Sequence, residues 1–184
     1  MTRSSTLASA LQYAIGTVEP VTPDLLRRPT PCRGWDLGML LAHACDSVAA
    51  IGEGVTGGEI ALVPVADLPA DPRHDFLEQA SRLLARCQDA PADGVVLVSG
   101  CPLAGDLLTA IGAIEIAVHG WDVSQARGAS LPIPESLAGQ LLPAARMLLC
   151  AEDRAHLFDP PQRACATASA SDQLAAFLGR IPGS

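Results

Sequence analysis

Residues 111–123 read IGAIEIAVHGWDV and place a carboxylate and an imidazole where a helix would carry only apolar side chains. In a helix, the apolar residues around them form one stripe at 3.6-residue spacing. That stripe consists of Ala104, Leu107, Leu108, Ile111, Ile114 and Val118. Glu115 projects from within the stripe, and His119 lies one turn further along, at its edge. Because an unpaired buried carboxylate is costly, the pattern predicts a metal ion held by Glu115, His119 and one more ligand.

The composition favours an all-α protein. A chain of 184 residues is expected to form one domain, residues 1–184, that buries about 70% of its extended-chain surface. Hydrophobic residues make up 49% of the chain, yet it has only three Phe, two Trp and one Tyr. The core must therefore consist mostly of Leu, Ile, Val and Ala, of which Ala and Leu are strong helix formers.

The charge and the apolar runs exclude several classes of partner. A net charge of −8 argues against nucleic acid and against an anionic membrane surface. The apolar stretch 7–18 is interrupted by Gln12 and reads as an amphipathic helix, and no run has the length of a membrane span. Six cysteines occur without a CxxC pair, which predicts reduced, mostly buried thiols in a cytoplasmic protein.

Hydrophobic periodicity and helix-boundary signals predict five helices followed by a tail with a short sixth helix. Asp36 is a good N-cap for the second helix, and the run VVLVS at 95–99 has a β-like composition. Together these segments predict one helical bundle with an additional short helix. The expected helices cover residues 5–18, 36–55, 72–89, 103–127, 134–152 and 171–179.

A control within the chain shows that spacing alone does not identify a metal site. His74 and Glu78 repeat the four-residue spacing, but they point away from the apolar stripe of their helix and indicate a solvated polar face. His156 lies near a helix end or loop and is expected at the surface. Neither histidine is therefore preferred as the third ligand.

His43 is the preferred third ligand. It lies in the middle of the second helix, at the flank of that helix's apolar stripe. Taken alone it is typical of a hydrogen-bonded core histidine, but together with Glu115 and His119 it completes a metal-binding set. Two imidazoles and one carboxylate suit zinc, and also nickel, iron, cobalt or manganese, and three protein ligands leave open positions as in catalytic sites.

Three further residues near this set receive structural interpretations. Asp122 projects from nearly the same face as Glu115 and could accept a hydrogen bond from a ligand histidine, but we prefer to interpret it as a helix-end residue. Cys32 precedes the second helix and has no evident base, whereas Cys45 turns to a face different from that of His43. Both thiols are predicted to be structural.

Three segments give the chain a family resemblance. They are TPCRGWDLGMLLAH (30–43), EIAVHGWDVSQARG (115–128) and LAAFLGRIPG (174–183). In this order they resemble the actinobacterial branch of the DinB-like superfamily, which includes mycothiol-dependent maleylpyruvate isomerases and related thiol transferases. The resemblance implies a four-helix bundle and a divalent metal held by a His–Glu–His set, at the positions of His43, Glu115 and His119.

The chain departs from the isomerases at its C-terminal end. Those enzymes carry a further domain that contributes to their active site, whereas only about thirty residues follow the fifth predicted helix here. We therefore expect thiol transfer more broadly and not maleylpyruvate isomerisation as such.

The sequence thus predicts a metal-dependent S-transferase or isomerase in which a small thiol, by resemblance mycothiol, attacks a small electrophile. His43, Glu115 and His119 would act through the metal, in a monomer or a homodimer. Two alternatives use the same three residues: a non-catalytic metal or small-molecule binding protein, and a hydrolase with metal-bound water as nucleophile. A purely structural bundle, in which Glu115 and His119 only bond each other, is the remaining interpretation.

Overall fold

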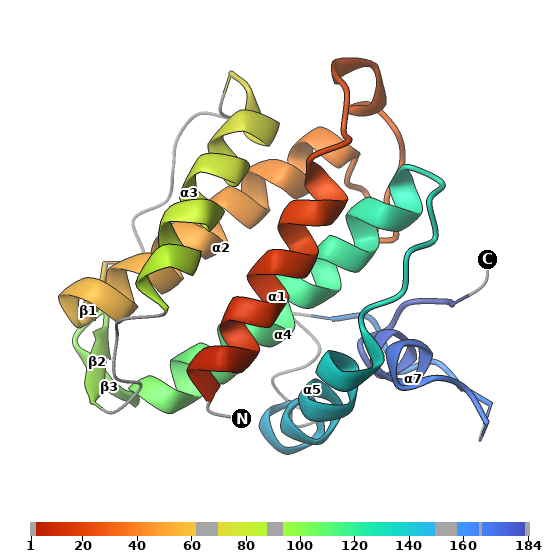
Figure 1. The fold of residues 1–184 in the computed structure, drawn as a ribbon. Coiled ribbons are helices and arrows are strands. Elements are labelled where there is room, and N and C mark those ends of the chain that lie inside the picture. Colours follow the sequence, from red (N-terminus) through yellow and green to blue (C-terminus); the bar gives the residue numbers. More distant parts are fainter. Residues whose placement is uncertain (1–2, 62–69, 88–93, 150–157, 166, 183–184) are drawn as a thin grey trace.

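Four helices form the body of the protein. The structure is a computed structural model that describes residues 3–61, 70–87, 94–149, 158–165 and 167–182. Within it, α1 (Arg3–Val18) packs on α4 (Gly105–Ala126), α4 on α2 (Leu37–Gly57), α2 on α3 (Pro72–Arg86), and α3 on α1, which closes a ring of four helices (Figure 1). The predicted all-α bundle is confirmed.

The bundle core is aliphatic, as the composition predicts. Each helix contributes buried side chains to one cluster, and Phe76 of α3 and Trp121 of α4 are buried aromatic residues within it. Among the largest buried side chains are Leu7, Leu11, Leu40, Leu41, Val48 and Val118.

Capping residues explain where α2 and α3 begin. Asp36 Oδ1 accepts the backbone N–H of Met39 at 2.9 Å, and Asp71 Oδ1 accepts that of His74 at 3.0 Å. Pro72 occupies the first turn of α3, where a missing N–H costs nothing. The predicted N-cap of α2 is confirmed.

Helix α4 differs from the predicted amphipathic helix because it is buried on nearly all sides. Most of its residues from Gly112 to Ser124 are buried, since α1, α2 and α5 all pack against it. The predicted stripe is correct for Ile114 and Val118, but Ile111 is 44% exposed and Ala104 belongs to a strand. Glu115 therefore lies at the open edge of α4 and not at the centre of its buried face.

A small sheet covers one end of the bundle. Strand β1 (Glu59–Ile60) pairs in parallel with β2 (Val95–Val98), which forms a hairpin with β3 (Cys101–Ala104). Ser99 and Gly100 both have positive φ at the hairpin turn, as a primed turn requires. The β-like run is confirmed as β2, whereas its two partner strands were not predicted.

The C-terminal helices pack beside the ring. Helix α5 (Glu135–Leu148) contacts α7 (Ala170–Phe177), and also α4 and α1. Figure 1 shows the pair in blue tones beside α4. The predicted fifth helix, 134–152, extends past Leu148 into residues that lie outside the described part of the chain.

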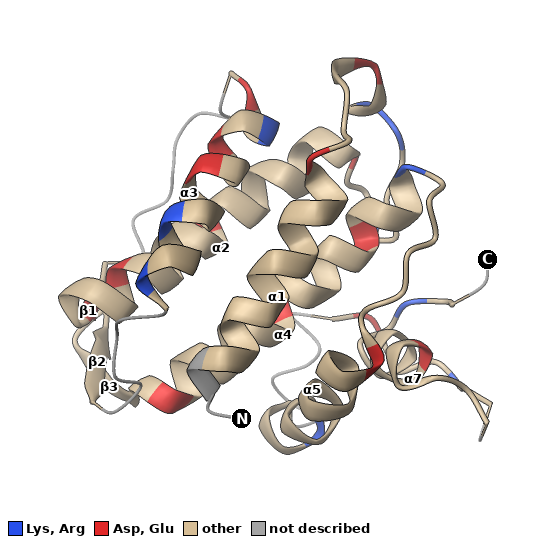
Figure 2. Ribbon diagram, viewed as in Figure 1, with Lys and Arg blue, Asp and Glu red and all other residues tan. Residues whose placement is uncertain are grey.

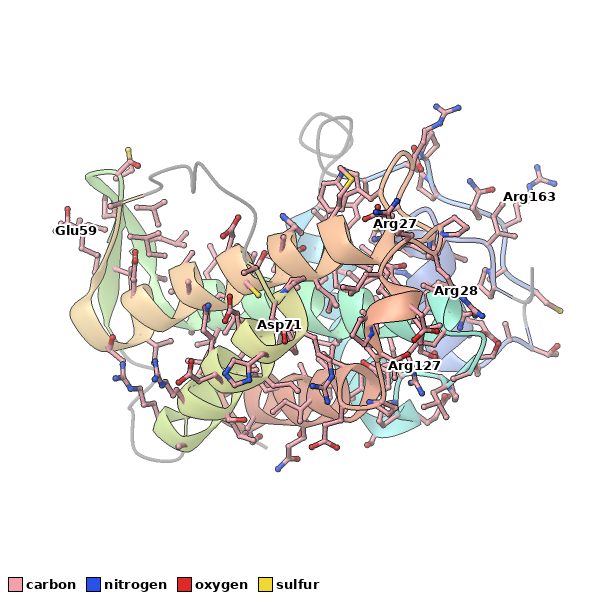
Figure 3. The ribbon with its side chains drawn as sticks, turned by 90° about the horizontal axis from the view of Figure 1, so that it is seen from above. Arg27, Arg28, Glu59, Asp71, Arg127 and Arg163 are labelled. Carbon is pink, nitrogen blue, oxygen red and sulfur yellow. The ribbon has the colours of Figure 1, made fainter. Side chains whose placement is uncertain are left out.

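Charged side chains are spread over the surface. Both acidic and basic residues lie along α3, and further charged residues are scattered over the other elements (Figure 2). In Figure 3, Arg27, Arg28 and Arg127 lie at the end of the bundle opposite Glu59 and the sheet. There Arg28 Nη1 donates to the Arg127 carbonyl at 3.3 Å, which ties the segment before α2 to the end of α4. Among the described residues, no helix is long and apolar enough to cross a membrane.

Candidate metal centre

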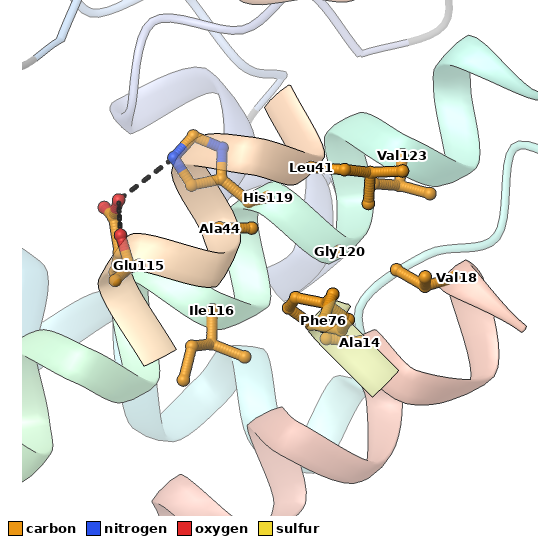
Figure 4. Close-up of a pocket in the computed structure, with 11 residues that line it drawn as sticks. Ala14, Val18, Leu41, Ala44, Phe76, Glu115, Ile116, His119, Gly120 and Val123 are labelled. Carbon is orange, nitrogen blue, oxygen red and sulfur yellow. Dashed lines mark hydrogen bonds and ion pairs between the residues drawn. The ribbon is translucent and has the colours of Figure 1, made fainter. Parts of the chain in front are cut away.

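The structure brings the three predicted ligands together. His43 comes from the middle of α2, whereas Glu115 and His119 lie one turn apart on α4. Oε1 of Glu115 is 2.8 Å from Nε2 of His43 and 3.1 Å from Nε2 of His119. The three ligand atoms all lie within 4.8 Å of one another. Figure 4 shows the Glu115 carboxylate facing the imidazole of His119.

The site is open on one side and closed on the other. The side chains of His43, Glu115 and His119 are 38%, 24% and 9% exposed, so access is from the His43 side. The ring of Trp35 lies 4.9 Å from that of His43, centroid to centroid, and borders this opening. The candidate ligands are therefore partly exposed to solvent on the side of His43.

Asp122 fixes the ring of His119 from behind. Nδ1 of His119 lies 3.0 Å from Oδ2 of Asp122, to which it donates, so Nε2 is directed at Glu115. Asp122 is fully buried and lies within α4, which continues to Ala126. The preferred interpretation of Asp122 as a helix-end residue is wrong, and the alternative hydrogen-bonding position is the one observed.

Arg180 pairs with Asp122 and was not predicted. Nε donates to Oδ1 at 3.1 Å and Nη2 to Oδ2 at 2.7 Å, and the arginine is only 8% exposed. It follows α7, so 58 residues separate the two partners and no local spacing connects them. The signal that could have indicated it is indirect: a buried aspartate needs a cation.

Cys32 joins the same network. Its Sγ donates to Oδ2 of Asp122 at 3.2 Å and accepts from Nη2 of Arg180 at 3.4 Å. Cys32, His119 and Asp122 also form a set with metal-ligand spacing. The guanidinium of Arg180 already supplies the positive charge at these atoms, and Nδ1 of His119 is bonded to Asp122. We therefore interpret Cys32, His119 and Asp122 as part of the network that holds His119 in place, and not as a separate metal site.

Contacts among the buried polar side chains determine the pKa values of Glu115 and His119. Burial raises the pKa of Glu115, but the adjacent His119 and His43 outweigh it and hold that pKa well below its usual value. Burial lowers the pKa of His119, but Glu115 and the hydrogen bond to Asp122 raise it well above its usual value. The carboxylate is thus strongly favoured in its charged, cation-binding form.

A small pocket extends from the ligands into the bundle (Figure 4). Glu115 and His119 form its polar wall, and the rest of its lining is mostly apolar and comes from all four helices of the ring. The apolar lining includes Ala14, Val18, Leu41, Phe76, Ile116 and Val123. The inner side of the candidate metal centre is therefore lined mostly by apolar side chains.

His74 does not join the centre. His74 and Glu78 are exposed on α3, and Glu78 pairs with Arg82 at 2.6 Å, which confirms the predicted polar face. His156 lies outside the described residues.

The cysteines are partly as predicted. Cys45 is buried and donates to the Pro72 carbonyl at 3.4 Å, and burial raises its thiol pKa to about 12. These contacts agree with its structural interpretation. The prediction of mostly buried thiols is wrong for Cys101 and Cys165, which are exposed because they lie on the hairpin and in the tail.

Comparison with known proteins agrees with this architecture. A family model described as the mycothiol maleylpyruvate isomerase N-terminal domain matches residues 7–124. The chain therefore belongs to this family, a mycothiol-related branch of the DinB-like helical bundles. The match includes all three candidate ligands, Asp122 and Cys32, whereas α5, α7 and Arg180 lie beyond it.

The relatives themselves carry no assigned activity. Two proteins of Mycobacterium tuberculosis, from strains CDC 1551 / Oshkosh and H37Rv, are each 30% identical to the chain, over 87% of its length and 87% of theirs. Both are described as uncharacterized proteins. No solved structure matches the chain significantly.

Proposed function

We propose that the protein is a metal-dependent thiol S-transferase or isomerase that joins a low-molecular-weight thiol, by family mycothiol, to a small electrophile. The convergence of two imidazole nitrogens and one carboxylate oxygen in a half-open site carries this proposal. Membership of a mycothiol-related family supports the choice of thiol.

The residues present fit a divalent metal. Asp122 accepts from Nδ1 of His119, so a metal that displaces the proton of Nε2 would find the lone pair of this nitrogen on the side of Glu115, as in other histidine ligands with an outer carboxylate. Glu115 contributes the negative charge, and His43 contributes a second nitrogen across the helix interface. Zinc suits this donor set best, with nickel, iron, cobalt and manganese as alternatives.

In the proposed reaction, the protein binds a metal and admits the two reactants to it. A divalent metal at this site would supply a Lewis acid that keeps a bound thiol in its thiolate form at neutral pH. His43, Glu115 and His119 hold the site together, and the open side at His43 and Trp35 admits the thiol and the electrophile. The buried network behind His119 keeps water away from its rear face.

The first experiment measures metal content and thiol consumption in the same sample. Protein purified without chelators is analysed for bound metal, then mixed with mycothiol and a set of electrophiles while free thiol is followed. We expect one metal per chain and metal-dependent loss of thiol. His119→Ala should lose both, whereas His74→Ala, a histidine on the polar face, should keep both.

Two other outcomes would decide against the proposal. Metal-loaded protein that consumes no thiol with any electrophile would indicate the binding-protein alternative. Hydrolysis of an ester or amide without thiol would indicate the hydrolase. Unchanged metal content in His119→Ala would show that the assigned ligands are wrong.

A further inference from the structure

We propose that Arg180 is a positioning residue for the metal centre, which acts by fixing the Asp122 carboxylate that in turn fixes His119. This inference rests on the metal site of the proposed function. It concerns a part of the chain beyond the family match, which ends at residue 124. The site would then be completed by the segment that follows α7.

The guanidinium of Arg180 is held in one orientation. Nε and Nη2 donate to the two oxygens of Asp122, and Nη1 donates to the carbonyl of Leu178 at 2.8 Å. The ring of Phe158 lies 5.5 Å from the guanidinium carbon. A two-point contact between arginine and a carboxylate fixes an angle as well as a distance.

Asp122 passes this orientation to His119. Its Oδ2 accepts from three donors: Nη2 of Arg180, Nδ1 of His119 and Sγ of Cys32. Asp122 has no exposed surface, so water cannot replace a lost donor. Without Arg180 the carboxylate loses both of its contacts with the guanidinium, and His119 loses a fixed acceptor for Nδ1. The direction of Nε2 toward a metal is then no longer determined.

Arg180 is not placed to bind substrate. It is buried, and all three of its nitrogens donate to groups of the protein. It also lies on the Nδ1 side of His119, whereas the ligand atoms Nε2 and Oε1 lie on the other side. A role that operates through Asp122 is the one that these contacts allow.

The test compares metal affinity in full-length variants. Zn²⁺ binding is measured by competition with a chromophoric chelator, and the absorption spectrum of the Co²⁺-loaded protein reports the geometry of the ligands. We expect Arg180→Ala to weaken Zn²⁺ binding by about 10–100-fold, which is the usual effect of removing a residue that holds a metal ligand in place. The same variant should shift the Co²⁺ spectrum. The Zn²⁺ affinity of Arg180→Lys should lie between those of the wild type and Arg180→Ala, because a lysine keeps the positive charge but lacks the planar guanidinium with its two parallel donors.

Arg127→Ala is the matched control. Arg127 follows α4 directly and donates to the Thr17 carbonyl at 3.1 Å, so its loss removes an arginine hydrogen bond away from the site. We expect its Zn²⁺ affinity and Co²⁺ spectrum to equal those of the wild type. If Arg180→Ala does not fold, the Zn²⁺ affinity and the Co²⁺ spectrum of Arg180→Lys are compared with those of Arg127→Ala, and this comparison tests the positioning role.

The outcomes separate this inference from the proposed function. If the wild type binds no divalent metal, both fall. If the wild type binds metal and the Arg180 variants bind it equally well, the positioning role is overturned and the metal site stands. Tighter binding in Arg180→Ala also overturns it, because that result would mean that the arginine acts mainly as a repelling charge.

Discussion

At the scale of single residues, the two nitrogens of His119 have separate tasks. Nε2 faces Glu115 and the open part of the site, whereas Nδ1 is held by Asp122 in the interior. Nε2 of His43 also faces Glu115, but the side chain of His43 is about four times more exposed than that of His119, 38% against 9%. We therefore propose that His119 would be the rigid ligand of a metal and His43 the adaptable one.

Glu115→Gln should abolish stable metal binding without unfolding the protein. Glutamine keeps the size of the side chain, but it removes the negative charge that favours a cation between the two imidazoles. Metal analysis and circular dichroism on the same sample check this. Glu78→Gln is the matched control, because Glu78 stands at the same spacing from His74 on an exposed face. Retained metal in Glu115→Gln would contradict the ligand assignment.

The cysteines should differ in reactivity. Cys101 and Cys165 are exposed, whereas Cys45 is buried with a thiol pKa raised to about 12 and Cys87 is buried with a raised pKa. Only the thiolate reacts, so at pH 8 about one Cys45 side chain in 10⁴ is reactive. Alkylation of the native protein followed by peptide mapping should label Cys101 and Cys165 first. Labelling of Cys45 at the same rate as Cys101 would contradict the burial of Cys45 described here.

The proximity of Glu115 and His119 could be predicted from the sequence because its signal is local. Glu115 and His119 lie four residues apart, and a histidine in a mostly apolar helix is conspicuous. The pairing of Asp122 with Arg180 could not be predicted in the same way, because it joins residues 58 positions apart. Asp122 itself is visible in the sequence beside Glu115 and His119, but no neighbouring residue indicates which cation accompanies it.

At the scale of elements, helices with local boundary signals were predicted well. Asp36 and Pro72 mark the starts of α2 and α3. Asp36 accepts the backbone N–H of Met39, three residues on, and Pro72 occupies the first turn of its helix. The pairing of β1 with β2 was missed because these strands are two and four residues long and are separated by a whole helix. Strand pairing depends on partners distant in sequence, which no single segment encodes.

Gly179→Ala should destabilise the tail and weaken the metal centre together. Gly179 has φ +87, and a Cβ there would meet the Asp159 carbonyl oxygen at 2.6 Å. A left-handed alanine costs about 1–2 kcal/mol, before the contact with Asp159 is counted. The shift would also displace the adjacent Arg180. Chemical denaturation and Zn²⁺ titration measure the two effects.

The control for this variant is Gly139→Ala in α5. Gly139 is exposed within the helix, and a Cβ there meets nothing within 4 Å. Because alanine is the better helix former, this change should stabilise the protein by about 0.5–1 kcal/mol. If Gly179→Ala behaves like Gly139→Ala, the tail is not held in the conformation described.

At the scale of the whole molecule, a metal at the proposed site would join α2 to α4 through residues 72 positions apart. A ligand that binds only the folded state stabilises it by about 2.7 kcal/mol at a free concentration of 100 Kd. For a chain of this size that corresponds to a rise in Tm of about 5–11 °C. Thermal unfolding with Zn²⁺ and with a chelator should show this shift in the wild type and in His74→Ala, but not in His119→Ala. An equal shift in all three proteins would place the metal elsewhere.

The contact between Asp122 and Arg180 also bears on the order in which the protein is made. A ribosome synthesises Asp122 58 residues before Arg180. The growing chain therefore contains every helix of the ring, and all three candidate ligands, before it can supply the guanidinium that accompanies the buried aspartate. Until then, the Asp122 carboxylate can meet His119 and Cys32 but lacks the guanidinium. The docking of the segment after α7 is therefore the last event that can complete the network behind the candidate metal centre.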